Sequence, residues 1–366
     1  MRINILRQTD RQTDRRNYGI DLLRLYSMFL ITILHVLGHG GVLETAQGAN
    51  WSVAWFLEIS AYCAVNCFAL ISGFVCYSDE EKPYRYRKYI SFWLHVFIYS
   101  FGIALVVYIL KPQSIGLKDL IKYALPVTLK KYWYVSAYTG LFFMIPWLNK
   151  FMRVCTKREC TILLVTFTAL FCVHSRVGDP YSLSGGYSFA WLVILYIVGA
   201  WMKKYHIPDF LKKRVWFVLL SGCIFVSWLW KNYSPIYSGL FVHYVSPTIL
   251  LVAISCLSVF SKLVIGDKLK QIIRFFSPAA FGVYLVHEHP IIRDHFIKNS
   301  FIWISSSSPV LLAVQVLACA FGIFAVCLAI DLIRICVFKL IKVDRIVDRV
   351  SDKINDKIRP LLSKII

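Results

Sequence analysis

The sequence predicts an all-α polytopic membrane protein, with about ten transmembrane helices and both termini in the cytoplasm. Of its 366 residues, 58% are hydrophobic and only 17% are charged, and the mean hydropathy is +0.61. Because a soluble surface needs more polar side chains than this, the long apolar runs are expected to face lipid. The second observation is the distribution of Lys and Arg, which cluster in alternate loops between these runs.

Ten apolar runs come close to the roughly 20 residues that a membrane-spanning helix needs, and the fifth is the shortest. The runs are residues 19–37, 52–76, 89–110, 132–149, 160–174, 186–202, 214–230, 240–261, 275–293 and 309–338. Arginines precede the first run, whereas residues 38–50 contain no Lys or Arg, so the N-terminus is predicted to be cytoplasmic. Basic residues then recur in every second loop. The lysine-rich loop 111–131 breaks this alternation, and it is predicted to be an interfacial or re-entrant segment.

The two ends of the chain differ from this membrane domain, which spans residues 19–338. Residues 1–18 are basic, contain the tandem RQTDRQTD and have no apolar face, so they are expected to be disordered. The tandem could reflect a slipping DNA repeat or a chance duplication. Residues 339–366 space Ile, Val and Leu three and four positions apart among mixed charges, which predicts a cytoplasmic amphipathic tail on the membrane surface.

Composition also excludes several classes of function. A net charge of +21 would suggest nucleic-acid binding in a soluble chain, but in these short loops it indicates anionic lipid as the partner. The eleven cysteines lie mostly inside apolar runs without a C-x-x-C motif, so buried thiols are expected rather than disulfides or a metal site. A cleavable signal peptide is not expected, because more membrane segments follow the first run directly.

The first run, GIDLLRLYSMFLITILHVL, contains an arginine and a histidine where an ionisable group is costly. Arg24 and His35 share one helix face and lie roughly 16 Å apart along its axis. Arg24 could bind a phosphate or carboxylate, or it could pair with Asp21 one turn earlier. His35 could take a proton from a hydroxyl, or it could bond between helices. These two residues are the catalytic candidates.

His39 follows His35 by one helical turn, so both imidazoles could face one cavity near the outer end of the helix. Such a pair could bind a metal, but no third ligand lies at a convincing spacing. We therefore predict no metal at this site.

Two motifs near the predicted cytoplasmic side could bind a cofactor. Ser72 and Gly73 in FALISGFVCYS allow close backbone approach, either to a ligand or in ordinary helix packing. Arg85, Arg87 and Lys88 follow directly and could bind the phosphates of a nucleotide-like cofactor or anchor lipid headgroups.

Aromatic and polar residues of the later runs are candidates for binding substrate. Trp133 and Tyr134 could stack on a sugar or form part of an interface belt. In AFGVYLVHEHPII, Pro290 is expected to kink or end the helix just after the histidines and the glutamate. HEHP is not a zinc-protease motif, because its histidines are two positions apart. The candidate substrate contacts are His39, Trp133, Tyr134, His287 and Glu288.

Taken in order across residues 19–293, these motifs resemble the acyltransferase-3 family of integral-membrane bacterial glycan O-acyltransferases. The matching elements are the Arg-x10-His of IDLLRLYSMFLITILH, then FALISGF, the basic block, YWYVSAYTGLFFMIPWL and AFGVYLVHEHP. The sequence departs from the family pattern in HEHP, where a plain H-P is usual. No extracytoplasmic hydrolase-like domain is expected after the tenth span, so a stand-alone enzyme is implied.

The resemblance implies an enzyme of the bacterial inner membrane that uses cytoplasmic acetyl-CoA or another acyl-CoA. The acceptor would be a hydroxyl of a cell-surface glycan or its lipid-linked precursor, such as lipopolysaccharide, O-antigen or capsule. Arg24 and His35 would be essential, and Arg24 with the basic block would orient the acyl-CoA phosphates. His35 would either deprotonate the hydroxyl or carry the acyl group itself.

A transporter or flippase for a glycan intermediate is the alternative of a different class. Ten spans with interior ionisable groups suit such a protein. However, the two halves of the chain show no internal repeat, and the buried charge is concentrated in one helix. The oligomeric state cannot be read from the sequence.

Overall fold

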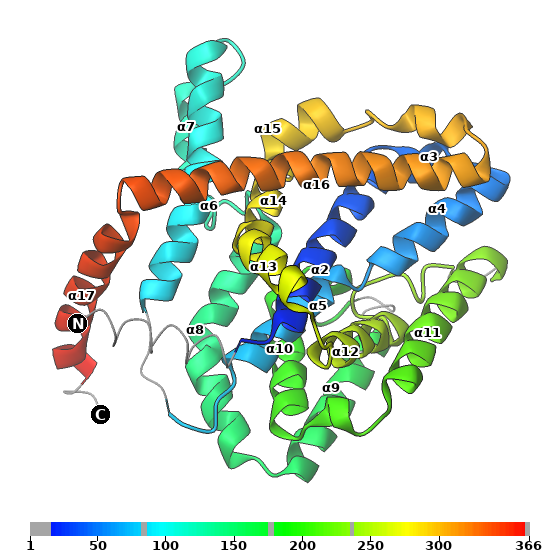
Figure 1. Ribbon diagram of the computed structural model, residues 1–366, viewed down its shortest axis with the longest axis horizontal. Coiled ribbons are helices and arrows are strands. Elements are labelled where there is room, and N and C mark those ends of the chain that lie inside the picture. The colour runs from blue at the N-terminus through cyan, green and yellow to red at the C-terminus, as the bar shows by residue number, and fades with distance from the viewer. Residues whose placement is uncertain (1–15, 82–85, 175–178, 235–237, 363–366) are drawn as a thin grey trace.

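The computed structural model describes residues 16–81, 86–174, 179–234 and 238–362, and all regular structure in these ranges is helical (Figure 1). The all-α prediction is confirmed for this part of the chain. The tandem repeat and Arg85 lie outside the described residues.

Each predicted apolar run corresponds to one or two helices. These are α2 (Tyr18–Leu37), α4 (Gly48–Ala61), α5 (Ala64–Cys76), α6 (Tyr86–Leu110), α8 (Trp133–Val154), α9 (Lys157–His174), α10 (Phe189–Lys204), α11 (Lys213–Tyr233), α12 (Pro247–Ser261), α14 (Ala280–His287) and α16 (Pro309–Leu340). The second run is divided into α4 and α5. In the ninth run, α14 ends at His287 and Pro290 begins the next helix, as the proline predicts.

Shorter elements connect these helices, and the 20-residue helix α17 follows α16. These are α3 (Val42–Thr45), α7 (Leu117–Tyr123), η1 (Ser184–Gly186), η2 (Ile207–Asp209), α13 (Asp267–Phe276), η3 (Ser277–Ala279), α15 (Pro290–Ile292), the π-helical η4 (Arg293–Ile297), η5 (Ile302–Ser306) and α17 (Val343–Leu362). The helix α7 lies within the lysine-rich loop 111–131, and α17 forms most of the predicted amphipathic tail.

Among the described residues, five helices are long and apolar enough to cross a membrane. They are Tyr18–Leu37, Gly48–Cys76 (α4 and α5 together), Tyr86–Leu110, Lys213–Tyr233 and Pro309–Leu340. The chain is therefore a membrane protein by length and composition of its helices. The count of ten spans and the side on which each terminus lies stay predictions.

Hydrogen bonds join segments that the loop charges predict on the same side of the membrane. On the predicted inner side, Asn149 Nδ2 donates to the carbonyl of Cys76 at 3.0 Å. On the predicted outer side, Asn50 Nδ2 donates to the carbonyl of Ser305 at 2.9 Å. These pairings agree with the predicted alternation of the loops.

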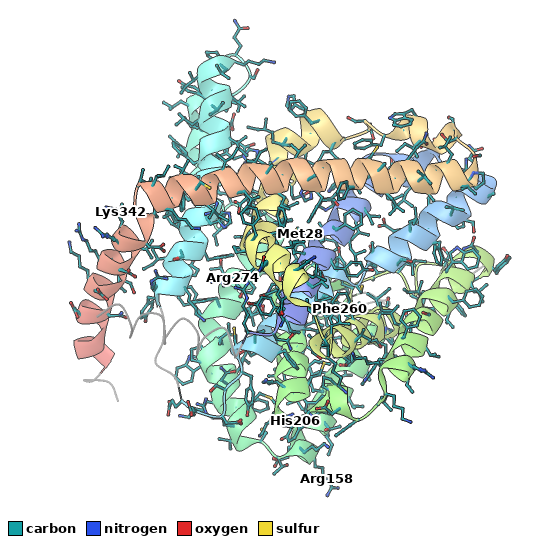
Figure 2. All side chains as sticks on the ribbon, viewed as in Figure 1. Met28, Arg158, His206, Phe260, Arg274 and Lys342 are labelled. Carbon is teal, nitrogen blue, oxygen red and sulfur yellow. The ribbon has the colours of Figure 1, made fainter. Side chains whose placement is uncertain are left out.

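The helix α2 lies in the interior of the bundle and packs against α4, α5, α12, α14 and α16. The long helix α16 crosses one face of the molecule in Figure 1. In Figure 2, Arg158 and Lys342 lie at the margin of the molecule, whereas Met28 of α2 lies inside it and is only 2% exposed. This position allows α2 to line a cavity inside the bundle.

The helices α5 and α10 approach each other closely because glycine lies on both. A Cβ added at Gly73 would lie 2.0 Å from the carbonyl oxygen of Tyr196, and one at Gly199 would lie 2.1 Å from that of Leu70. Helix packing, the alternative that the sequence left open, therefore accounts for Gly73.

Gly73→Ala is expected to lower the free energy of unfolding by about 1–3 kcal/mol, because the added methyl group overpacks the contact between α5 and α10. The matched control is Gly102→Ala in α6, where an added Cβ would meet no heavy atom within 4 Å. Thermal unfolding followed by tryptophan fluorescence in detergent compares the two variants. Equal midpoints would contradict the close packing.

Candidate functional site

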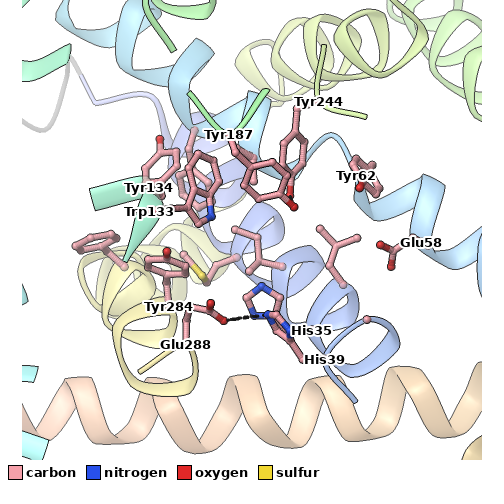
Figure 3. A pocket seen from close by; sticks show the side chains of 17 residues that line it. His35, His39, Glu58, Tyr62, Trp133, Tyr134, Tyr187, Tyr244, Tyr284 and Glu288 are labelled. Carbon is pink, nitrogen blue, oxygen red and sulfur yellow. Dashed lines mark hydrogen bonds and ion pairs between the residues drawn. The ribbon is translucent and has the colours of Figure 1, made fainter. Parts of the chain in front are cut away.

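A cavity of about 250 Å³ lies beside α2, and Figure 3 shows the side chains that line it. Five of the predicted site residues line this cavity, and they come from α2, from α8 and from the turns that follow α2 and α14. They are His35, His39, Trp133, Tyr134 and Glu288. The structure thus brings most of the predicted substrate contacts to the predicted base.

Glu288 contacts both His35 of α2 and His39 in the turn that follows α2. Its Oε2 lies 3.3 Å from Nδ1 of His35 and 3.5 Å from Nε2 of His39. Its other oxygen accepts a hydrogen bond from Arg293 Nη1 at 3.1 Å. Because Glu288 is only 7% exposed, this cation offsets much of the cost of burying the carboxylate.

His287 fixes the tautomer of His35. Nδ1 of His287 lies 2.5 Å from the carbonyl oxygen of Val283, so it must be the protonated nitrogen of a neutral ring. Nε2 of His287 then accepts, and its partner at 2.8 Å is Nδ1 of His35, which must donate. In a neutral His35 the lone pair is therefore on Nε2.

Nε2 of His35 has no hydrogen-bond partner among the described residues, and the ring lines the cavity. An imidazole with a free lone pair on one nitrogen and a carboxylate behind the other can take a proton from a bound hydroxyl. His287 does not line the cavity, so it acts on His35 rather than on a ligand in the cavity.

The prediction of no metal rests on the lack of a third ligand beside His35 and His39, and this reason is wrong. The structure brings Glu288 to the two histidines as a possible third ligand. The ligand atoms of His35, His39 and Glu288 lie within 4.8 Å of one another. The group could hold a metal by this measure. However, a metal on Nδ1 of His35 would replace its bond to His287, and Arg293 already compensates Glu288. The contacts fit a proton relay better than a metal centre.

Arg24 lies just beyond the predicted inner end of the cavity and does not line it. The cavity extends along α2 from Met28, one turn beyond Arg24, and past the end of the helix to His39. Arg24 forms an ion pair with Asp21, the alternative that the sequence left open, and Arg16 Nε contacts the same carboxylate at 2.5 Å. One cavity therefore does not join Arg24 to His35.

The other predicted cofactor contacts that the structure describes, which are Ser72, Gly73, Arg87 and Lys88, do not line the cavity either. Lys88 lies in the first turn of α6 and Arg24 in the second turn of α2, both in segments at the predicted inner side of the membrane. Ser72 donates back to the carbonyl of Phe68 within α5.

Arg87 faces the tail rather than the cavity. Its Nε lies 2.5 Å from Asp348 Oδ1 and its Nη2 lies 3.2 Å from Asp344 Oδ1, both in α17. A ligand phosphate at Arg87 would compete with these two carboxylates.

Several residues of the cavity escaped the sequence analysis. They are Glu58, Tyr62, Tyr187 and Tyr244 in its wall, and Arg293 behind Glu288. Glu58 is an acidic residue inside an apolar run, so the rule that selected Arg24 and His35 would also have selected it.

Three thiols gather outside the cavity. The Sγ atoms of Cys63, Cys67 and Cys256 lie within 4.8 Å of one another, and all three residues are buried. The sequence predicts buried thiols and no metal site, but this close group has the donor set of a soft-metal site.

One protein family matches most of the chain. The model of the acyltransferase 3 domain, described as an acyltransferase domain, matches residues 17–332. The match covers every residue that lines the cavity. No curated protein and no solved structure matches the chain.

Proposed function

Because the chain belongs to the acyltransferase-3 family and is a membrane acyltransferase, we propose that it transfers an acetyl group from acetyl-CoA to a glycan hydroxyl. The acceptor is a cell-surface glycan or its lipid-linked precursor, and the enzyme crosses the bacterial inner membrane in about ten spans with both termini inside. The observation that carries this proposal is the free Nε2 of His35 in the cavity, with Glu288 facing the other ring nitrogen.

His35 acts as a general base in this proposal. Nε2 accepts the proton of the sugar hydroxyl as its oxygen attacks the thioester carbonyl, and Glu288 stabilises the imidazolium that forms. The CoA sulfur leaves as a thiolate and takes that proton back from His35, so the products are the ester and free CoA. The Tyr284 hydroxyl, one turn before Glu288 and also in the cavity wall, donates to the carbonyl oxygen as its charge develops.

Acyl-CoA enters from the inner end of α2 in this proposal. Arg24 and Lys88 supply positive charge there, and the face of α2 that carries Met28 and Ile31 leads from Arg24 to His35. The thioester then has roughly 16 Å to cover along the helix axis. The ion pair with Asp21 uses only one side of the Arg24 guanidinium, which has five N–H donors.

Two measurements test the proposed function. Purified protein in nanodiscs is expected to move label from acetyl-CoA onto glycan extracted from a deletion strain. Mass spectrometry of the surface glycan of that strain is expected to show the loss of one acetyl group per modified sugar. A deletion that changes only the amount of glycan would instead indicate a transporter or flippase.

Rapid quenching separates direct transfer from an acyl-histidine intermediate. With labelled acetyl-CoA and no acceptor, we expect no label on the protein, because the proposed general-base route forms no covalent intermediate on His35. Label on His35 itself would overturn direct transfer and leave the acyl relay.

A further inference from the structure

Glu58 of α4 is a buried carboxyl group that the described part of the protein leaves unsatisfied. It is 7% exposed, its Oε2 has no hydrogen-bond partner, and it forms no ion pair with any described residue. Figure 3 shows it extending from α4 into the cavity, on the opposite side of His35 from Glu288. Because a buried polar group without a partner is costly, its partner is expected to be a ligand in this cavity.

A continuous aromatic wall lies beside Glu58. The ring centroids of Trp133 and Tyr187 lie 4.6 Å apart, those of Tyr187 and Tyr244 lie 4.9 Å apart, and those of Tyr244 and Tyr62 lie 5.0 Å apart. Aromatic rings pack well against a ligand with an apolar face and polar edges, and a few polar groups then fix its orientation. A pyranose ring has this character, with C–H groups on its faces and hydroxyls at its edge.

The wall is built from segments at the predicted outer side of the membrane. Trp133 begins α8, Tyr187 follows η1, and Tyr244 precedes α12. Arg24 and Lys88, in contrast, belong to segments at the predicted inner side. A donor from the cytoplasm and an acceptor from the outer side would thus meet at His35.

Building on the proposed function, we propose that Glu58, Tyr62, Trp133, Tyr187 and Tyr244 form the acceptor subsite, which binds one pyranose ring of the glycan. Glu58 bonds a hydroxyl of that ring other than the one that is acylated. It thereby determines which hydroxyl lies near Nε2 of His35. Glu58 is a specificity-determining residue and takes no part in moving the proton.

The kinetic test uses the full-length protein in nanodiscs, with acetyl-CoA and glycan from the deletion strain as substrates. Glu58→Ala is expected to raise the KM for glycan at least about tenfold, as expected when a buried polar contact is lost, and to change the KM for acetyl-CoA by less than about twofold. Glu58→Gln keeps a carbonyl acceptor and should recover part of the loss. The matched control is Glu44→Gln, an exposed carboxylate near the same predicted side.

A binding test needs no transfer at all. Saturation-transfer NMR with the methyl pyranosides of glucose, galactose, mannose and rhamnose is expected to detect at least one of them on the wild type. The signal should fall at least about fivefold in Glu58→Ala, as expected for a lost hydrogen bond, and should persist in Glu44→Gln.

The outcomes separate the subsite from the proposed function. A wild type that binds glycosides but transfers no acetyl group supports the subsite and contradicts the function. Active protein with unchanged glycan KM in Glu58→Ala overturns the subsite alone. Equal changes in both KM values, or no glycoside signal from the wild type, also overturn it.

Discussion

His35→Ala is expected to slow acyl transfer by a factor of about 10²–10⁴, the range that a positioned general base contributes. The variant loses the nitrogen that takes the hydroxyl proton, while the bond between Glu288 and Arg293 stays in place. Initial rates with labelled acetyl-CoA and saturating glycan measure the loss. Thermal unfolding of the same preparation shows whether the protein is still folded.

The matched control for this variant is His206→Ala. That histidine lies at the start of η2, its side chain is 77% exposed, and it is outside the cavity. It should keep wild-type activity. If His35→Ala kept a tenth or more of the activity, another group in the cavity would have to be the base.

The part of the site on α2 could be predicted from the sequence because it depends on one helix. The spacing of Arg24 and His35 fixes a shared face, and the cost of charge in an apolar run points to function. Pro290 likewise ends α14 for a local reason. Local geometry and composition carry these predictions without knowledge of the tertiary structure.

The contacts between helices could not be predicted in the same way. Glu288 reaches His35 only because α14 packs beside α2, so neither the proton relay nor the third potential metal ligand has a signature in local spacing. The structure also decides between alternatives that the sequence leaves open. Gly73 allows the close contact between α5 and α10, and Arg24 forms an ion pair with Asp21. Glu58 differs from these contacts, because an acidic residue inside the apolar run 52–76 is visible in the sequence itself.

Glu288→Gln is expected to lower kcat by about 10²–10³-fold, the range for removing one preorganised group that stabilises charge in the transition state. The amide keeps the shape of the side chain but removes the negative charge that faces Nδ1 of His35. The imidazolium formed on proton uptake then lacks its counter-charge. The KM for acetyl-CoA should change little, because Glu288 lies away from Arg24 and Lys88.

Asp294→Asn is the control that separates this role from support of Arg293. Asp294 is the other carboxylate partner of Arg293, with its Oδ1 3.0 Å from Nε, but only Glu288 also contacts His35 and His39. If Glu288 acts through His35, Asp294→Asn should stay within about twofold of wild-type kcat, since exposed ion pairs contribute little. Equal losses in the two variants would mean that both carboxylates serve to hold Arg293, and His35 would then need another source for its basicity.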